Sequence, residues 1–446
     1  MGEGVSGRMI IAATAGHDSP KLSILLGGTT ACQLLVSVGM QWFAIATLGA
    51  GIQTDALLAG MTLPLLCITL GVESLTFVLT PMLATLSEAD RRRQAWQLLL
   101  AVGAISVVAA GTLALAAPLL IPVLVPGFGP EARALTLTLT RVQLCSVGGA
   151  ACYAVLAGLC HARGQFLRAA LAALVCLAAA WAVLIWRLHA DGVLLAAWMQ
   201  VLVYVGPPLL LIQAAGRPRT GPAWPPELAQ VWRRLRPVFL TAGYCRSGFV
   251  VDRCLASLTG PGGLVILDLG QRLQGAAARI MNEALVTPHV PTLARIAATR
   301  QWDSFRAVYE RQRRRVAVVA SGLAAVIVVA SVAGRPWLGV LLPNAPIGDT
   351  LHRLVPVLGC LSGIAATASL THGLTAAFYA MGDTDTPSRI GASMHTVGLA
   401  AKVIGAVSGG LPGIALGITA SHVCNWLVLE YAWASTFATS RPTPSA

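Results

Sequence analysis

The chain has 446 residues, of which 56% are hydrophobic and only 11% are charged. Soluble globular proteins contain about 25% charged residues, so this chain has too little polar surface to cover a water-soluble fold. The formal net charge is +13, but the charges lie mainly in short loops between long apolar runs. This distribution is typical of a membrane protein, and we expect no nucleic-acid partner.

Twelve apolar runs, each long enough to cross a bilayer as a helix, follow a mixed segment at residues 1–20. The first run is too long for a signal peptide, so we expect it to be a retained span. The predicted fold class is an all-α polytopic membrane protein with about 12 transmembrane helices. The predicted spans are 22–48, 56–84, 95–124, 132–160, 166–187, 192–213, 237–259, 263–292, 316–342, 350–381, 388–409 and 411–436.

Arginines are concentrated in alternate loops, which by the positive-inside rule lie in the cytoplasm. The opposite loops hold little beyond Arg133, Arg187 and Arg335. With an even number of spans, both termini are predicted to be cytoplasmic, in a bacterial inner membrane. The arginines of the predicted cytoplasmic loops are Arg91, Arg92, Arg93, Arg163, Arg168, Arg217, Arg219, Arg233, Arg234, Arg236, Arg295, Arg300, Arg306, Arg311, Arg313, Arg314, Arg315 and Arg389.

Two similar stretches indicate an internal repeat. Residues 80–86 (TPMLATL) end span 2, and residues 287–293 (TPHVPTL) end span 8. We expect two six-helix bundles in parallel repeat around a central cavity. The predicted segments are 1–20 (cytoplasmic N-terminal segment), 21–213 (N-terminal bundle), 214–236 (cytoplasmic linker), 237–437 (C-terminal bundle) and 438–446 (cytoplasmic tail).

Between residues 294 and 315, Trp302, Phe305 and Tyr309 alternate with arginines at helical spacing. This pattern favours an amphipathic helix on the cytoplasmic lipid surface. A solvated extension of span 8 explains the pattern equally well.

Span 8 carries Asp268, Arg272, Arg279 and Glu283, which at 100° per residue fall within about a 60° arc. An ionisable side chain at mid-bilayer costs about 2.5–3.5 kcal/mol on insertion scales, so this stripe cannot face lipid. We expect it to line the central cavity. The alternative is a stripe that is paired internally between helices.

Other charged residues within spans are expected to reach the same cavity. Arginine-rich surroundings suit an anionic headgroup, because guanidinium groups bind phosphate through charge-assisted forked hydrogen bonds. The predicted substrate-binding residues are Arg272, Arg246, Arg253, Arg279, Lys402 and Arg141. The predicted gating or coupling residues are Asp55, Glu73, Asp252, Asp268 and Glu283.

The scattered cysteines show no C-x-x-C spacing. The sequence also lacks a Walker loop, an H-E-x-x-H motif and a nucleophile elbow. We therefore expect no metal and no cofactor, and a transporter rather than an enzyme. Its transport is expected to be coupled to the membrane potential, H⁺ or Na⁺.

Several short segments, in order, resemble the MurJ/MviN lipid II flippase family of the multidrug/oligosaccharidyl-lipid/polysaccharide exporter superfamily. The resemblance extends over about residues 40–430. It implies that Arg272 corresponds to a cavity arginine that binds the headgroup, and Asp55 to an acidic residue at the outer gate. The segments are 49–51 (GAG), 54–56 (TDA), 126–128 (PGF), 251–253 (VDR), 272–273 (RL), 291–293 (PTL) and 386–387 (TP).

The sequence departs from the family where arginines are usual in spans 1 and 2, because the aligned positions are Leu34, Met40 and Ile68. Family members also commonly have fourteen spans. The resemblance therefore implies a divergent flippase that moves lipid II or a related undecaprenyl-diphosphate-linked saccharide to the periplasmic leaflet by alternating access.

The expected partners are this lipid-linked saccharide with its diphosphate headgroup, membrane lipids and proteins of cell-envelope biosynthesis. The alternatives left open are an exporter of an exopolysaccharide lipid intermediate or a small molecule, a membrane-embedded glycan enzyme, and a transport-dead scaffold.

Overall fold

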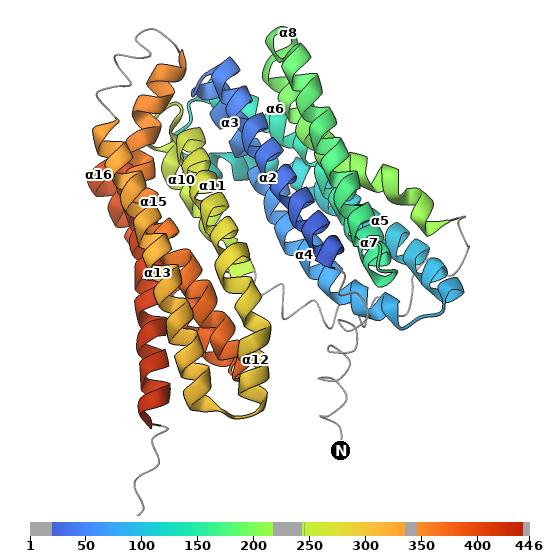
Figure 1. Ribbon diagram of the computed structural model, residues 1–446. Coiled ribbons are helices and arrows are strands. Elements are labelled where there is room, and N and C mark those ends of the chain that lie inside the picture. Colours follow the sequence, from blue (N-terminus) through green and yellow to red (C-terminus); the bar gives the residue numbers. More distant parts are fainter. Residues whose placement is uncertain (1–19, 217–242, 245, 335–345, 440–446) are drawn as a thin grey trace, which may run out of the picture. The chain divides into compact units, whose positions relative to one another are not determined.

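A computed structural model describes residues 20–216, 243–244, 246–334 and 346–439 (Figure 1). Every regular element in these ranges is helical, which confirms the predicted all-α class. The predicted linker 214–236 and the terminal segments 1–20 and 438–446 lie almost entirely outside the described residues.

The first half of the chain forms long helices that break at glycine, or at short irregular joints. Predicted span 2 is built from α3 and α4, and predicted span 4 from α6 and α7. Gly192 has φ +65°, so α8 consists of two helices that turn at this residue. The helices are α2 (Pro20–Leu48), α3 (Ile52–Gly60), α4 (Thr62–Ala84), α5 (Glu88–Leu124), α6 (Pro130–Gln143), α7 (Cys145–Ala162) and α8 (Phe166–Ala215).

The described residues of the second half also form mainly long helices, and an irregular stretch follows α11. Helix α11 passes directly into a π-helical turn, η1, and a 3₁₀ turn, η2, before α12 begins. Gly410 has φ +56°, which divides α16 into two helices. The elements are α10 (Gly248–Ser257), α11 (Gly263–Met281), η1 (Asn282–Val286), η2 (Thr287–His289), α12 (Val290–Ala298), α13 (Trp302–Ala333), α15 (Pro346–Ala380) and α16 (Asp385–Thr439).

Within the described ranges, eight helical segments are long and apolar enough to cross a membrane. Two of them, Phe166–Ala215 and Asp385–Thr436, contain the turns at Gly192 and Gly410 and therefore each correspond to two predicted spans. Predicted span 8 is not among the eight, since α11 carries three charged side chains in 19 residues. The chain is a multi-pass membrane protein, as the sequence predicts.

Contacts divide the chain into two compact units. Unit 1 comprises residues 1–40, 63–114 and 142–239, and unit 2 comprises 41–62, 115–141 and 240–446. Unit 2 thus includes two pieces from the first half of the sequence, which the predicted boundaries assign to the N-terminal bundle. Leu79, Leu156 and Leu211 are buried in the core of unit 1, and Leu264, Leu361 and Ile414 in that of unit 2.

Two of the three aromatic residues near the start of α13, Phe305 and Tyr309, are packed inside unit 2, whereas Trp302 is 41% exposed. Phe305 and Tyr309 are 0% and 3% exposed, and their rings lie 6.1 and 4.4 Å from the ring of Trp433 on α16. The amphipathic pattern therefore reflects burial against protein, and its interpretation as a lipid-surface helix is wrong. The segment is also continuous with predicted span 9 in one helix rather than extending span 8.

Candidate functional site

The site is built on the α10–α11 hairpin of unit 2, whose turn is fixed by a distant carboxylate. The buried Asp55 of α3 accepts hydrogen bonds from the backbone amides of Gly262 at 2.6 Å and Val265 at 2.9 Å. The first amides of a helix have no partner within the helix, and the helix dipole favours negative charge at this end. Asp55 therefore caps α11 from another part of the chain and sets where α11 begins.

Asp268, on the second turn of α11, is the centre of a charged network. Its carboxylate accepts hydrogen bonds from Arg272 Nε at 2.7 Å, Gln41 Nε2 at 2.9 Å and Arg253 Nη2 at 3.3 Å. One carboxylate thus holds two guanidinium groups, one from α10 and one from α11. This is the internal pairing that the sequence left open as an alternative for the Asp268–Arg272 part of the stripe.

Arg253 is buried by these contacts. Its Nη1 also donates to the carbonyl oxygen of Leu58 at 2.9 Å and to Thr62 Oγ1 at 3.0 Å. The guanidinium lies 5.6 Å from the Phe249 ring centroid. A buried charge is tolerated only when it is paired and hydrogen-bonded, and Arg253 meets this condition by joining α10 to α3, α4 and α11.

Arg272 is held by the same carboxylate but is far more accessible. Its side chain is 41% exposed, against 6% for Arg253 and 14% for Asp268. Because the ion pair at Nε restrains the side chain, the direction of the guanidinium is largely set before any ligand arrives. Such preorganisation lowers the entropic cost of binding an anion.

A second ion pair lies beside this network. Lys402 Nζ of α16 is 2.7 Å from Asp252 Oδ1 of α10, and both side chains are buried. Gln271 Nε2 of α11 donates to Asp252 Oδ2 at 2.9 Å. The pair explains how Lys402 is accommodated deep within predicted span 11. Together the network has three cations (Arg253, Arg272, Lys402) and two carboxylates (Asp252, Asp268), an excess of one positive charge.

The cavity inside the hairpin is too small for a substrate. It has a volume of about 20 Å³, which is roughly the space for one water molecule. The network is therefore a packed polar hub rather than an enclosed pocket, and its accessible group is Arg272. The cavity is lined by Phe249, Asp252, Arg253, Ala256, Leu264, Leu267, Asp268 and Gln271.

The other predicted site residues lie apart from this hub or are not placed in it. Arg279 pairs with Glu283 at 3.1 Å, and both side chains are more than half exposed. Glu283 belongs to the π-helical turn η1, so the regular 100° spacing assumed for the stripe ends at Met281. Arg141 is exposed on the last turn of α6, and Arg246 is half-buried before α10. Glu73 lies in α4, and its side chain is outside the described part of the structure.

Three uncharged residues of the hub are not among the predicted site residues, all of which are ionisable. They are Gln41, Thr62 and Gln271, which donate to or accept from Asp268, Arg253 and Asp252, respectively. Gln41 and Gln271 lie in predicted spans, where an amide needs a polar partner. That requirement is the signal that points to them.

The sequence profile of a family described as "Lipid II flippase MurJ" matches residues 45–440. The chain belongs to this family. It is therefore a membrane transporter of the flippase type rather than an enzyme, and its family acts on a lipid-linked precursor. No curated protein matches the chain in a sequence search.

Solved structures support the same fold. A structure of the lipid II flippase MurJ in an inward closed conformation has a TM-score of 0.76 and 14% identity, covering 92% of this chain and 87% of that one. An inward-facing multidrug resistance MATE family transporter has a TM-score of 0.73 and 14% identity, covering 92% and 96%. A transporter of the same superfamily from Pyrococcus furiosus has a TM-score of 0.59 and 16% identity, covering 94% and 95%.

Proposed function

We propose that the protein translocates an undecaprenyl-diphosphate-linked glycan precursor, lipid II or a related lipid-linked saccharide, from the cytoplasmic to the periplasmic leaflet. The observation that carries this proposal is Arg272, which is oriented by Asp268, partly exposed, and part of a network with one positive charge in excess. We place the protein in a bacterial inner membrane with both termini in the cytoplasm, because of the arginine-rich alternate loops.

Arg272 is the residue proposed to contact the diphosphate. A guanidinium forms strong, directional hydrogen bonds to phosphate oxygens. Asp268 restrains Arg272 through Nε, and Arg253 is a positioning residue, since its hydrogen bonds go to protein groups. Lys402 belongs to the same network. For Arg246, Arg279 and Arg141, which are not placed in the hub, we propose a contribution to the positive potential along the substrate path rather than direct binding of the headgroup at Arg272.

Alternating access needs contacts that hold one conformation and can be released. Asp55 ties α3 to the start of α11, and we propose that it acts as a gate contact. The Asp252–Lys402 pair is the proposed coupling element, since protonation of Asp252 or binding of Na⁺ would release the Lys402 ammonium from α10. Glu73 and Glu283 are the other candidates for coupling to H⁺, Na⁺ or the membrane potential.

The proposal is tested by complementation of a bacterial strain depleted of its essential lipid II flippase, with lysis and externally labelled lipid II as readouts. Arg272→Ala should abolish rescue, whereas Arg272→Lys should retain part of it. Arg306→Ala is the matched control, because Arg306 is also exposed and its Nε also pairs with a carboxylate four residues away on the same helix, Glu310 at 2.8 Å, as that of Arg272 does with Asp268. Rescue by Arg272→Ala at normal protein levels would refute the role of Arg272.

If the unmodified chain is inserted but does not rescue, the proposed cargo narrows to another lipid-linked saccharide, such as an exopolysaccharide intermediate. A second candidate function, export of a small molecule, is favoured only by the fold it shares with the multidrug transporter. Ethidium accumulation in cells with and without the protein distinguishes the two, because a glycolipid flippase should leave it unchanged.

A further inference from the structure

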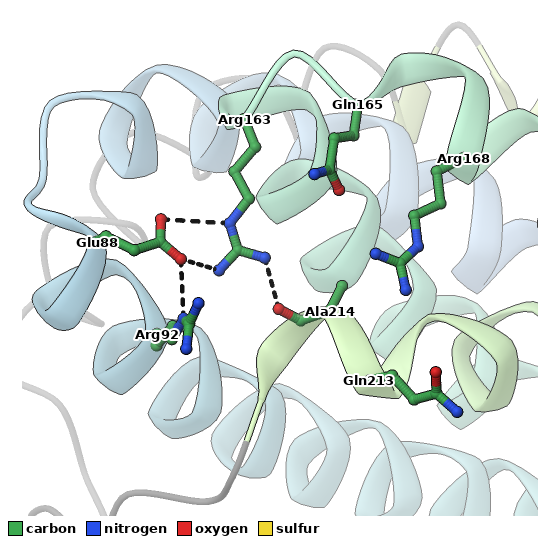
Figure 2. A pocket seen from close by; sticks show the side chains of 7 residues that line it. All are labelled: Glu88, Arg92, Arg163, Gln165, Arg168, Gln213 and Ala214. Carbon is green, nitrogen blue, oxygen red and sulfur yellow. Dashed lines mark hydrogen bonds and ion pairs between the residues drawn. The ribbon is translucent and has the colours of Figure 1, made fainter.

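Unit 1 contains a basic pocket that lies outside the hub of unit 2. It has a volume of about 390 Å³, within the range of about 300–1,000 Å³ that is usual for ligand sites. Three arginines and one glutamate give it a formal charge of +2. The pocket is lined by Glu88, Arg92, Arg163, Gln165, Arg168, Gln213 and Ala214 (Figure 2).

Part of this pocket is a fixed frame. Glu88 accepts hydrogen bonds from Arg92 Nε at 2.8 Å and Arg163 Nη2 at 2.5 Å, and Arg163 Nη1 donates to the Ala214 carbonyl oxygen at 2.5 Å. These bonds join the start of α5, the loop before α8 and the end of α8. The single carboxylate is thus shared between two guanidinium groups.

The remaining polar side chains are not part of that frame. Figure 2 shows Gln165, Arg168 and Gln213 without a hydrogen bond or ion pair to any other residue drawn. Arg168 and Gln213 are exposed, on the first and last turns of α8. Helix α8 also begins without a side-chain cap, so its first-turn amides add to the positive potential. The pocket therefore has the donors and the charge to bind a phosphate.

The pocket lies at the expected depth of lipid headgroups. Its residues are at helix ends that the positive-inside rule places at the cytoplasmic surface. Trp96, one turn after Arg92, donates its indole N–H to the Gly216 carbonyl oxygen at 3.3 Å. Tryptophan is enriched at the membrane–water interface, and the cytoplasmic leaflet is rich in anionic lipids that attract basic groups.

Exposed apolar side chains follow the polar ones on each of the two helices that make up α8, before and after the turn at Gly192. Leu171 and Val175, three and seven residues after Arg168, are 42% and 56% exposed, and Leu209, four residues before Gln213, is 67% exposed. Residues at these spacings share a helix face. A lipid can place its phosphate in the basic pocket and its acyl chains against these apolar side chains, whereas a free anion would contact the pocket alone.

We propose that this pocket binds the phosphate of an anionic phospholipid of the surrounding bilayer. Arg168 is the main ligand contact, with Gln165 and Gln213 as further donors, while Arg92 and Arg163 supply the fixed positive wall. The site is independent of the cargo and does not rest on the flippase proposal.

The test uses the purified full chain in detergent and measures binding of dioleoyl phosphatidylglycerol by native mass spectrometry. Phosphatidylcholine, glycerophosphoglycerol and inorganic phosphate are the comparison ligands. We expect Arg168→Gln to weaken phosphatidylglycerol binding roughly tenfold or more, since it removes a charge-assisted hydrogen bond. Arg93→Gln is the matched control, because Arg93 is exposed and close in sequence to Arg92 but does not line the pocket. It should change binding less than about twofold.

Each outcome decides the proposal. Selective loss in Arg168→Gln, with weak binding of the two soluble anions, supports a lipid site. Equal loss in both variants would show only a general attraction to charge. Binding of inorganic phosphate as tight as that of the lipid would make the pocket a free-anion site. The last two outcomes overturn the proposal, as does unchanged binding in Arg168→Gln. A thermal unfolding midpoint like that of the unmodified chain excludes misfolding as the cause of a loss.

Discussion

The Asp55 carboxylate accepts a hydrogen bond of 2.6 Å from the backbone amide of Gly262, 207 positions later in the sequence. Asp55 also accepts from Val265, so it caps α11 from α3. The α10–α11 hairpin, which holds Arg253 and Arg272, is therefore positioned by a residue of α3 as well as by its own turn.

Removing the Asp55 cap should measurably lower the stability of the protein. We expect Asp55→Ala to lower the free energy of unfolding by about 1–2 kcal/mol, because two helix amides lose their acceptor and the helix dipole loses its counter-charge. Thermal unfolding in detergent is the measurement. Asp383→Ala is the control, because the Asp383 carboxylate also accepts a hydrogen bond from a backbone amide, that of Thr386 at 2.9 Å at the start of α16. Asp383 is less buried than Asp55, so its loss should lower the free energy of unfolding by less. If Asp383→Ala lowered the free energy of unfolding more than Asp55→Ala, this would contradict the role of Asp55 as the cap of α11.

Asp268 should matter more for stability than Arg272. Asp268→Asn leaves the buried Arg253 without its carboxylate, and breaking one side of a buried ion pair costs about 3–5 kcal/mol. Arg272→Gln removes a partly exposed partner, for which about 1 kcal/mol or less is expected. Unfolding in mixed detergent with increasing dodecyl sulfate ranks the two variants. Equal losses would mean that Arg253 does not depend on Asp268.

The Asp252–Lys402 pair should behave as a coupled unit. Lys402→Met leaves a buried carboxylate unpaired, and Asp252→Asn leaves a buried ammonium unpaired, so each single change should be strongly destabilising. The double variant Asp252→Asn with Lys402→Met should lose less than the sum of the two. A double-mutant cycle on the unfolding free energy measures this coupling, and additive losses would show that the two side chains do not interact.

Gly192 tests the turn that divides α8. Gly192 has φ +65° and ψ −155°, a backbone conformation almost restricted to glycine, in which a side chain is strained by about 1–3 kcal/mol. Nothing lies within 4 Å of an added Cβ atom, so Gly192→Ala should be destabilising through backbone strain alone. Gly111→Ala is the matched control, since Gly111 is helical with the same open space. It should be neutral, or stabilising by up to about 1 kcal/mol. The same sign for both changes would be inconsistent with a turn at Gly192.

Much of the architecture follows from the sequence because it depends on local properties. The apolar runs give the membrane spans, and the positive-φ glycines at 192 and 410 fall where predicted spans meet. The ion pairs Asp268–Arg272 and Arg279–Glu283 are also local, because residues four apart on a helix are neighbours. The family resemblance rests on short motifs of the same kind, and the profile match to residues 45–440 confirms it.

The tertiary structure alone decided which distant groups meet. Nothing local joins Lys402 to Asp252 or Asp55 to α11, and the assignment of residues 41–62 and 115–141 to unit 2 depends on packing. The aromatic face of α13 illustrates why packing is not predictable from the sequence pattern. A helical period identifies an apolar face, but both lipid and protein can cover such a face. The periodicity of the sequence therefore establishes that a face avoids water, while only the fold determines what covers it.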